Sequence, residues 1–174
     1  KDSRFSLKYI LAILNSQLIK SYWLSKYNDN KDLFPKIKGY QLKQLPIKEI
    51  SLENQQPFIE KANLMLSLNK ELQEVSAKFQ RNLQREFSLD ALSKKLQNWY
   101  ELSFADFLKE LSKSKGSRPL GLSEKAEWED YFLQEQQKAI SIKSKIEQTD
   151  VAIDQMVYEL YGLTEEEIEI VENS

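Results

Sequence analysis

Few residues of this sequence have the types and spacing that catalysis requires. The chain contains neither His nor Cys, which excludes imidazole acid–base catalysis, thiol nucleophiles, disulfides and zinc sites built on those ligands. A metal-dependent nuclease would need carboxylates beside a lysine, and Asp29-Asn30-Lys31 is the sole Asp/Glu-x-Lys match. A sequence this rich in acids and lysines produces such matches by chance, so we interpret this one as part of a polar loop.

Two further kinds of chemistry find no support. The glutamates from Glu165 onwards resemble a metal site, but a solvated first turn of a helix, where the macrodipole favours negative charge, explains them better. The four Gly and four Pro are scattered, so the chain has neither a phosphate-binding loop nor the Gly-rich turn of a methyltransferase. We therefore expect no catalytic, metal-binding or cofactor-binding residue in this chain.

The charge is unevenly distributed along the sequence. Residues 1–50 carry ten Lys/Arg against four Asp/Glu, whereas the remainder carries 15 against 23, which gives the net charge of -2. A basic N-terminal third is a candidate surface for DNA phosphates. The alternative, which stays open, is that these lysines lie on solvated helix faces.

The candidate DNA-binding residues lie in a basic connector, residues 36–48. They are four lysines and one tyrosine: Lys36, Lys38, Tyr40, Lys43 and Lys48. Tyr40 follows Gly39 between lysines and is the aromatic residue most free to face a partner. Stacking on single strands by Tyr22, Trp23 and Tyr27 is the other possibility, but their helical spacing favours a place in the core. A second basic cluster, Lys113, Lys115 and Arg118, is interpreted as a solvated loop tip.

The elements around the connector are predicted to be helical. Apolar residues at helical spacing predict one helix over residues 5–27, followed by a polar loop. Residues 33–50 contain three of the chain's helix breakers, Pro35, Gly39 and Pro46, and are predicted to be irregular with one helical turn near Gln41.

Two long helices are predicted over about 54–88 and 123–161, the first capped by Ser51 or Asn54 and the second by Ser123 and ended by Gly162. Shorter helical pieces are expected over 89–102 and 103–111. Each long helix has a heptad-like apolar stripe that only packing can bury, so we predict a mainly α fold with an antiparallel, coiled-coil-like pair. The seam positions of this spacer are Leu72, Val75, Phe79, Ile142, Ile146 and Ile153.

Specific strings add a resemblance to this pattern. The chain resembles the target-recognition domain of TaqI-like, type IIG restriction-modification enzymes, and is similar to type I specificity subunits. The strings that carry the resemblance are Phe34-Pro35-Lys36-Ile37, Gln41-Leu42-Lys43-Gln44-Leu45-Pro46-Ile47, Gln55-Gln56-Pro57-Phe58-Ile59, and residues 10–16 and 153–168. In the family, a Leu-Pro-Ile-Pro turn leads into a long spacer helix; here Lys48 replaces the second proline.

The resemblance implies a function for a larger protein. It implies a site-specific adenine DNA methyltransferase that uses S-adenosylmethionine and is sometimes fused to an endonuclease. The family's catalytic Asn-Pro-Pro-Tyr-type motif is absent here, so no catalytic residue can be carried over. We expect this chain to be a piece of that protein: residues 1–50 would end the recognition lobe, and residues 51–174 would form the helical spacer. Its partners would be double-stranded DNA and the parent's methyltransferase domain, in the cytoplasm and away from membranes.

Another class of protein fits the heptads equally well. A structural coiled-coil or dimerisation module without DNA contact would have the same two helices. It would not explain the basic connector or the strings shared with the restriction-modification family.

Overall fold

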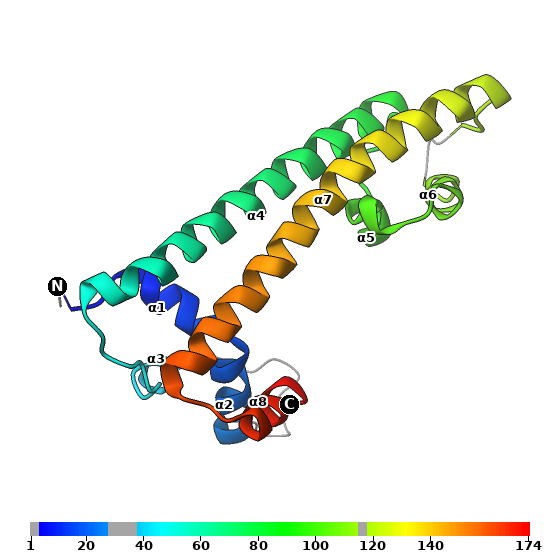
Figure 1. Cartoon of the computed structure of the whole chain (residues 1–174). Coiled ribbons are helices and arrows are strands. Elements are labelled where there is room, and N and C mark those ends of the chain that lie inside the picture. Colours follow the sequence, from blue (N-terminus) through cyan, green and yellow to red (C-terminus); the bar gives the residue numbers. More distant parts are fainter. Residues whose placement is uncertain (1–3, 28–37, 115–117) are drawn as a thin grey trace. The chain divides into compact units, whose positions relative to one another are not determined.

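The computed structural model describes residues 4–27, 38–114 and 118–174. Within these ranges every regular element is a helix and there is no strand. The elements are α1 (Leu7–Leu14), α2 (Gln17–Tyr27), α3 (Gly39–Leu42), α4 (Leu52–Glu86), α5 (Lys94–Gln97), a 3-10 turn (Trp99–Glu101), α6 (Phe104–Leu111), α7 (Leu122–Tyr161) and α8 (Glu165–Glu172) (Figure 1). The predicted mainly α class is therefore confirmed.

The chain forms two compact units. A terminal unit comprises Lys1–Leu66 and Glu147–Ser174, and a central unit comprises Ser67–Ile146. Both long helices continue from one unit into the other, so each unit contains part of α4 and part of α7. The predicted boundary at residue 50 divides the expected recognition lobe from the expected spacer and does not coincide with the limits of the compact units. It stays a prediction.

The core of the central unit is dominated by aromatic rings. Phe79 of α4 is fully buried and stacks on Trp99, with ring centroids 3.7 Å apart. Phe107 of α6 and Phe132 of α7 pack around the same two rings. Aromatic side chains bury the most apolar surface per residue, so this cluster stabilises a small unit well. Figure 1 shows the end of α4 and the start of α7 running side by side here.

The core of the terminal unit joins α1 to the other parts of the same two helices. Tyr9 and Ile13 of α1 are fully buried and cluster with Phe58 of α4 and Val157 of α7. In the terminal unit the first part of α4 thus packs with the last part of α7. In the central unit the last part of α4 packs with the first part of α7. The predicted antiparallel pairing of the two long helices is confirmed by these two cores.

The predicted seam residues fall at different depths. Phe79, Ile142 and Ile153 are buried. Leu72 and Val75 are partly buried against the central core, and Ile146 is half-buried. Two polar residues of α7, Glu135 and Thr149, are also buried, and Glu135 pairs with Lys138 at 2.6 Å.

The single helix predicted over residues 5–27 is wrong, because the chain breaks into α1 and α2 at Asn15 and Ser16. The Asn15 side chain donates to the Leu11 carbonyl at 2.8 Å, and the Ser16 hydroxyl donates to the Ile13 carbonyl at 2.7 Å. Both side chains satisfy carbonyls at the end of a helix, as short polar residues do near helix ends. A carboxylate of α7, Asp154, then accepts the Gln17 N–H at 2.7 Å and begins α2.

The long helices begin close to the predicted positions. Ser51 accepts the Asn54 N–H and caps α4, as predicted. Ser123 is not the cap of α7, because that helix begins one residue earlier, at Leu122, and Glu124 accepts the Gly121 N–H at 2.9 Å. Gly162 has a φ of +72° and follows the end of α7, as predicted.

The continuous helical piece predicted over residues 89–102 is also interrupted. Ser93 accepts the Leu96 N–H and starts the short helix α5. Asn98 ends α5 with non-helical backbone angles and precedes the 3-10 turn. Leu96 of α5 and Trp99 of the 3-10 turn are both fully buried in the core.

Candidate nucleic-acid interface

The described part of the connector, residues 38–48, contains the single helical turn that the sequence predicts, α3. The Gln41 side chain accepts the Lys38 N–H at 2.9 Å and holds the start of α3. After α3 the chain is not helical as far as Ser51, and Leu45 is its one buried hydrophobic residue in the described part. Leu45 and the half-buried Ile47 pack on the core of the terminal unit and attach this part of the connector to it.

Lys38 and Lys43 are the two connector lysines that the structure leaves available. Both are exposed. Among the described residues, neither ammonium group has a hydrogen-bonding or ion-pair partner. Tyr40 lies between them in the sequence and is 57% exposed. This combination suits contact with phosphate oxygens, which lysine binds as a point charge.

Lys48 has a different place. Its ammonium donates to the Leu160 carbonyl at 2.6 Å, and its backbone N–H donates to the Tyr161 hydroxyl at 3.1 Å. The positive charge therefore lies at the C-terminal end of α7, where the helix macrodipole favours it. Lys48 fixes the connector to α7, a role that the sequence pattern did not reveal.

Two tyrosines complete this attachment of the connector. The Tyr9 hydroxyl donates to the Lys48 carbonyl at 2.6 Å, and the Tyr161 hydroxyl donates to the Pro46 carbonyl at 2.5 Å. Burial raises the pKa of Tyr9 to about 12 and also raises the pKa of Tyr161. Both phenols thus remain protonated donors at any ordinary pH.

Some predicted residues cannot be placed. Lys36 lies outside the described residues, as do Asp29-Asn30-Lys31 and Lys115.

The aromatic residues of α2 are half-buried: Trp23 packs on Tyr27 with centroids 4.7 Å apart, and the Tyr27 hydroxyl donates to Gln44 of the connector at 3.0 Å. These side chains join α2 to the connector instead of forming an open stacking surface.

The described parts of the connector and of the helices before it are basic. Residues 4–27 and 38–48 contain no Asp or Glu at all, and their basic residues are Arg4, Lys8, Lys20, Lys26, Lys38, Lys43 and Lys48. Residues 28–37 add two lysines and two aspartates and leave the balance unchanged. These segments are therefore basic although the chain as a whole is slightly acidic, and Glu49, Asp154 and the glutamates of α8 adjoin them.

Comparison with known families divides the chain at the same region. Residues 51–157, more than half of the chain, match the model of a domain of unknown function, DUF8810. The chain belongs to this family. Residues 1–47 match the TaqI-like C-terminal specificity domain, so the predicted resemblance is confirmed for this segment. Neither the curated proteins nor the solved structures include a significant match.

The two matches assign the elements to different families. The segment similar to the TaqI-like specificity domain contains α1, α2 and α3, with Lys38 and Lys43. The DUF8810 segment contains α4 and most of α7, with the helices between them. Neither match extends over α8, so the predicted resemblance of residues 153–168 to the end of TaqI-like enzymes stays a prediction.

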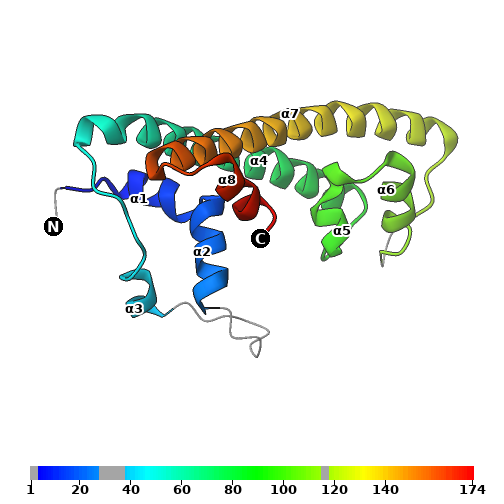
Figure 2. The same ribbon diagram turned by 60° about the horizontal axis from the view of Figure 1, so that its bottom comes forward.

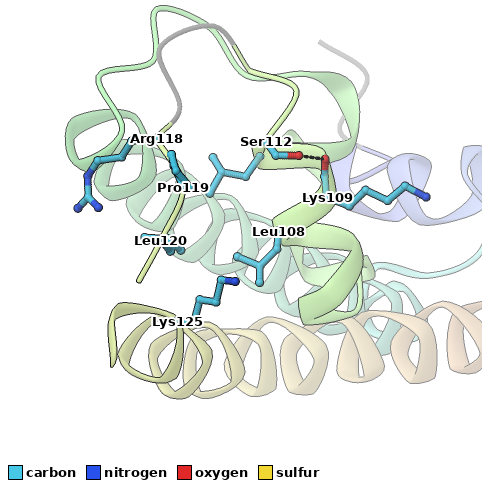
Figure 3. Close-up of a pocket in the computed structure, with 8 residues that line it drawn as sticks. Leu108, Lys109, Ser112, Arg118, Pro119, Leu120 and Lys125 are labelled. Carbon is cyan, nitrogen blue, oxygen red and sulfur yellow. Dashed lines mark hydrogen bonds between the residues drawn. The ribbon is translucent and has the colours of Figure 1, made fainter. Parts of the chain in front are cut away.

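Within the DUF8810 segment, the central unit has a shallow pocket with basic residues at its rim (Figure 3). It encloses about 280 Å³ over Leu108 and Leu120. Arg118 at the rim donates to both carboxylate oxygens of Glu124, at 2.7 and 2.9 Å. Lys113, from the same predicted cluster, pairs with Glu110 at 2.9 Å. These ion pairs offset the positive charges, which favours the interpretation as a loop tip.

The described residues contain neither a cluster of metal ligands nor a membrane-spanning helix. No three His, Cys, Asp or Glu side chains there are grouped so that they could hold a metal ion. The glutamates of α8 instead begin that helix, where Thr164 and Glu167 form a reciprocal capping box. None of the described helices has the length and apolar character needed to span a bilayer.

Proposed function

We propose that this chain is part of the DNA target-recognition domain of a restriction-modification methyltransferase, and that its connector contacts DNA phosphates. The observation that carries the proposal is the match of residues 1–47 to a specificity domain. The surface supports it, because this segment has nine basic residues against three acidic ones, and Lys38 and Lys43 are exposed and have no ion-pair partner among the described residues.

The proposal gives each segment a separate task. The connector contributes phosphate contacts through Lys38 and Lys43, with Lys36 as a third. Tyr40 would face the same stretch of the DNA backbone. Lys48 holds the connector on α7. The antiparallel helices act as a spacer that docks the sequence-reading lobe on the parent's methyltransferase domain.

The parent protein would supply the chemistry. Its methyltransferase domain would bind S-adenosylmethionine and transfer the methyl group to adenine in the cytoplasm. An endonuclease fusion of type IIG would add cleavage. Specificity domains are not catalytic, and this chain is assigned a positioning role only.

A salt titration of DNA binding tests the proposal. The purified chain is titrated with a fluorescent mixed-sequence duplex, by anisotropy, at several salt concentrations from low to physiological ionic strength. We expect log affinity to fall linearly with log salt, with a slope of about -0.9 for each phosphate contacted. Absence of duplex binding even at low salt would overturn the proposal.

A structural module without DNA contact is the second candidate function. Its support is the DUF8810 match over the helical pair and the exposed apolar side chains along both helices. These side chains are Leu64, Leu66, Leu133, Ile140 and Val151. The same titration separates the two functions, since a pure scaffold binds no duplex at any salt and its association is seen instead by sedimentation.

A further inference from the structure

The terminal unit contains an apolar groove that neither its own fold nor the proposed DNA contact uses. It encloses about 370 Å³ between α1, α2 and the connector. Its walls are apolar, formed by Leu11, Leu14, Trp23, Leu24, Leu42 and Leu45. Three of these leucines remain accessible, with 37%, 39% and 44% of the surface of Leu11, Leu24 and Leu42 exposed. Contiguous exposed apolar surface of this kind marks an interaction site.

The charge around the groove restricts what it can accept. Lys20 lines the groove itself, and Lys43 follows Leu42 directly in the sequence. No acidic residue occurs in the described segments that form the walls, residues 4–27 and 38–48. A partner that inserts apolar side chains here meets Lys20 as the charged residue of the groove wall, so acidic flanking residues are favoured in that partner.

Helix α2, which forms one wall of the groove, already packs against an acidic amphipathic helix of this chain. α8 packs on α2 (Figure 2), and the Gln17 side chain of α2 donates to the Val171 carbonyl of α8 at 3.3 Å. α8 contributes buried Val171 and carries five glutamates within eight residues: Glu165, Glu166, Glu167, Glu169 and Glu172. Ile19, Trp23 and Leu24 of α2 line the groove instead.

We propose that this groove binds an acidic amphipathic helix of a partner protein. The helix would place leucine-like side chains, spaced three and four residues apart, against Trp23 and Leu24, and would direct carboxylates at Lys20 and Lys43. The interaction does not depend on the proposed DNA contact.

Two other occupants fit the surface less well. A second copy of this chain, docked symmetrically through the same groove, would bring Lys20 and Lys43 against their own equivalents, and like charges across an interface oppose association. A DNA duplex would satisfy the lysines, but its phosphates and sugars would leave the apolar walls without partners.

Binding of designed peptides tests the proposal. The probes are three synthetic 16-residue peptides: an amphipathic helix with leucines at helical spacing and glutamates elsewhere, the same peptide with lysines for the glutamates, and a scrambled acidic peptide of identical composition. We expect the first to bind the chain, and the other two to bind at least about tenfold more weakly, since they lose the charge match or the apolar stripe.

Variants locate the binding site. Leu24→Asp should weaken binding of the acidic amphipathic peptide by about tenfold or more, because it places a carboxylate and removes apolar surface in the groove. Leu52→Asp, at an exposed leucine of α4 outside the groove, should leave the affinity unchanged. Circular dichroism confirms folding, and Leu42→Asp, on the connector wall, replaces the first variant if that one unfolds.

Several outcomes would overturn the proposal. They are no binding of the acidic amphipathic peptide, equal binding of the scrambled peptide, and equal loss in Leu52→Asp and Leu24→Asp. If a DNA duplex competes with the peptide and the Leu24→Asp variant binds that duplex more weakly, the groove binds DNA instead. A dimer that dissociates in Leu24→Asp would give it to a second copy of the chain.

Discussion

Two carboxylates that begin helices have pKa values shifted in opposite directions. Glu124, at the start of α7, has its pKa lowered to about 2 by the hydrogen bonds from Arg118 and from the Gly121 N–H. Asp154 also accepts a backbone N–H, from Gln17 at the start of α2, yet burial raises its pKa, and Asp150 and Glu172 reinforce the increase. The Arg118 guanidinium stabilises the charged form of Glu124, whereas removal from water destabilises the charged form of Asp154.

The raised pKa of Asp154 leads to a prediction about stability. An acid whose pKa is higher in the folded state contributes less stability as the pH rises through that pKa. Asp154→Asn keeps an oxygen that can accept the Gln17 N–H and removes the penalised charge. We therefore expect its melting temperature at pH 7 to exceed that of the wild type, with a difference that shrinks as the pH falls through the raised pKa of Asp154 towards about 4.

Asp154→Ala is the control for this prediction. It removes the charge and the acceptor together, and loss of a helix-capping acceptor costs about 1 kcal/mol. Thermal unfolding at pH 7 should rank the asparagine variant above the wild type and the alanine variant below the asparagine variant. An asparagine variant less stable than the wild type at pH 7 would show that the carboxylate stabilises α2 despite its burial.

At the scale of elements, periodicity predicted the long helices well and their ends less well. Apolar residues every three or four positions fixed the existence and pairing of α4 and α7, because only mutual packing buries such stripes. The break between α1 and α2 was missed, since Leu14 and Leu18 continue the apolar spacing across Asn15 and Ser16. The decisive cap, Asp154, comes from a distant part of the sequence.

Two isoleucines of α7 test the antiparallel packing. Ile142 is buried and 5% exposed, whereas Ile140, two residues earlier, is 44% exposed. Ile142→Asp should lower the free energy of unfolding by about 3 kcal/mol or more, since it places an unpaired charge in the apolar interface. Ile140→Asp should change it by no more than about 0.5 kcal/mol. Chemical denaturation measures both, and equal effects would contradict the arrangement of α7.

At the scale of the whole molecule, the sequence indicated the connector as the candidate site. It did not show which of the connector lysines are exposed and which are bound to the rest of the chain. Charge asymmetry and the family strings indicated the connector, and the match of residues 1–47 to a specificity domain agrees. The role of Lys48 depends on a carbonyl more than a hundred residues away, at Leu160. The apolar groove was missed because Trp23 was expected in the core, and helical spacing does not show which apolar residues remain uncovered.

The most direct test of the DNA-contact account compares two triple variants in the salt titration. Lys36, Lys38 and Lys43 are replaced with glutamine in one, and Lys78, Arg81 and Arg85, exposed cations of α4, in the other. The account predicts that the connector variant binds the duplex more weakly and flattens the slope by about 0.9 per lost contact, while the α4 variant keeps the wild-type slope. A connector variant with wild-type affinity and slope, or equal flattening in both variants, would contradict it.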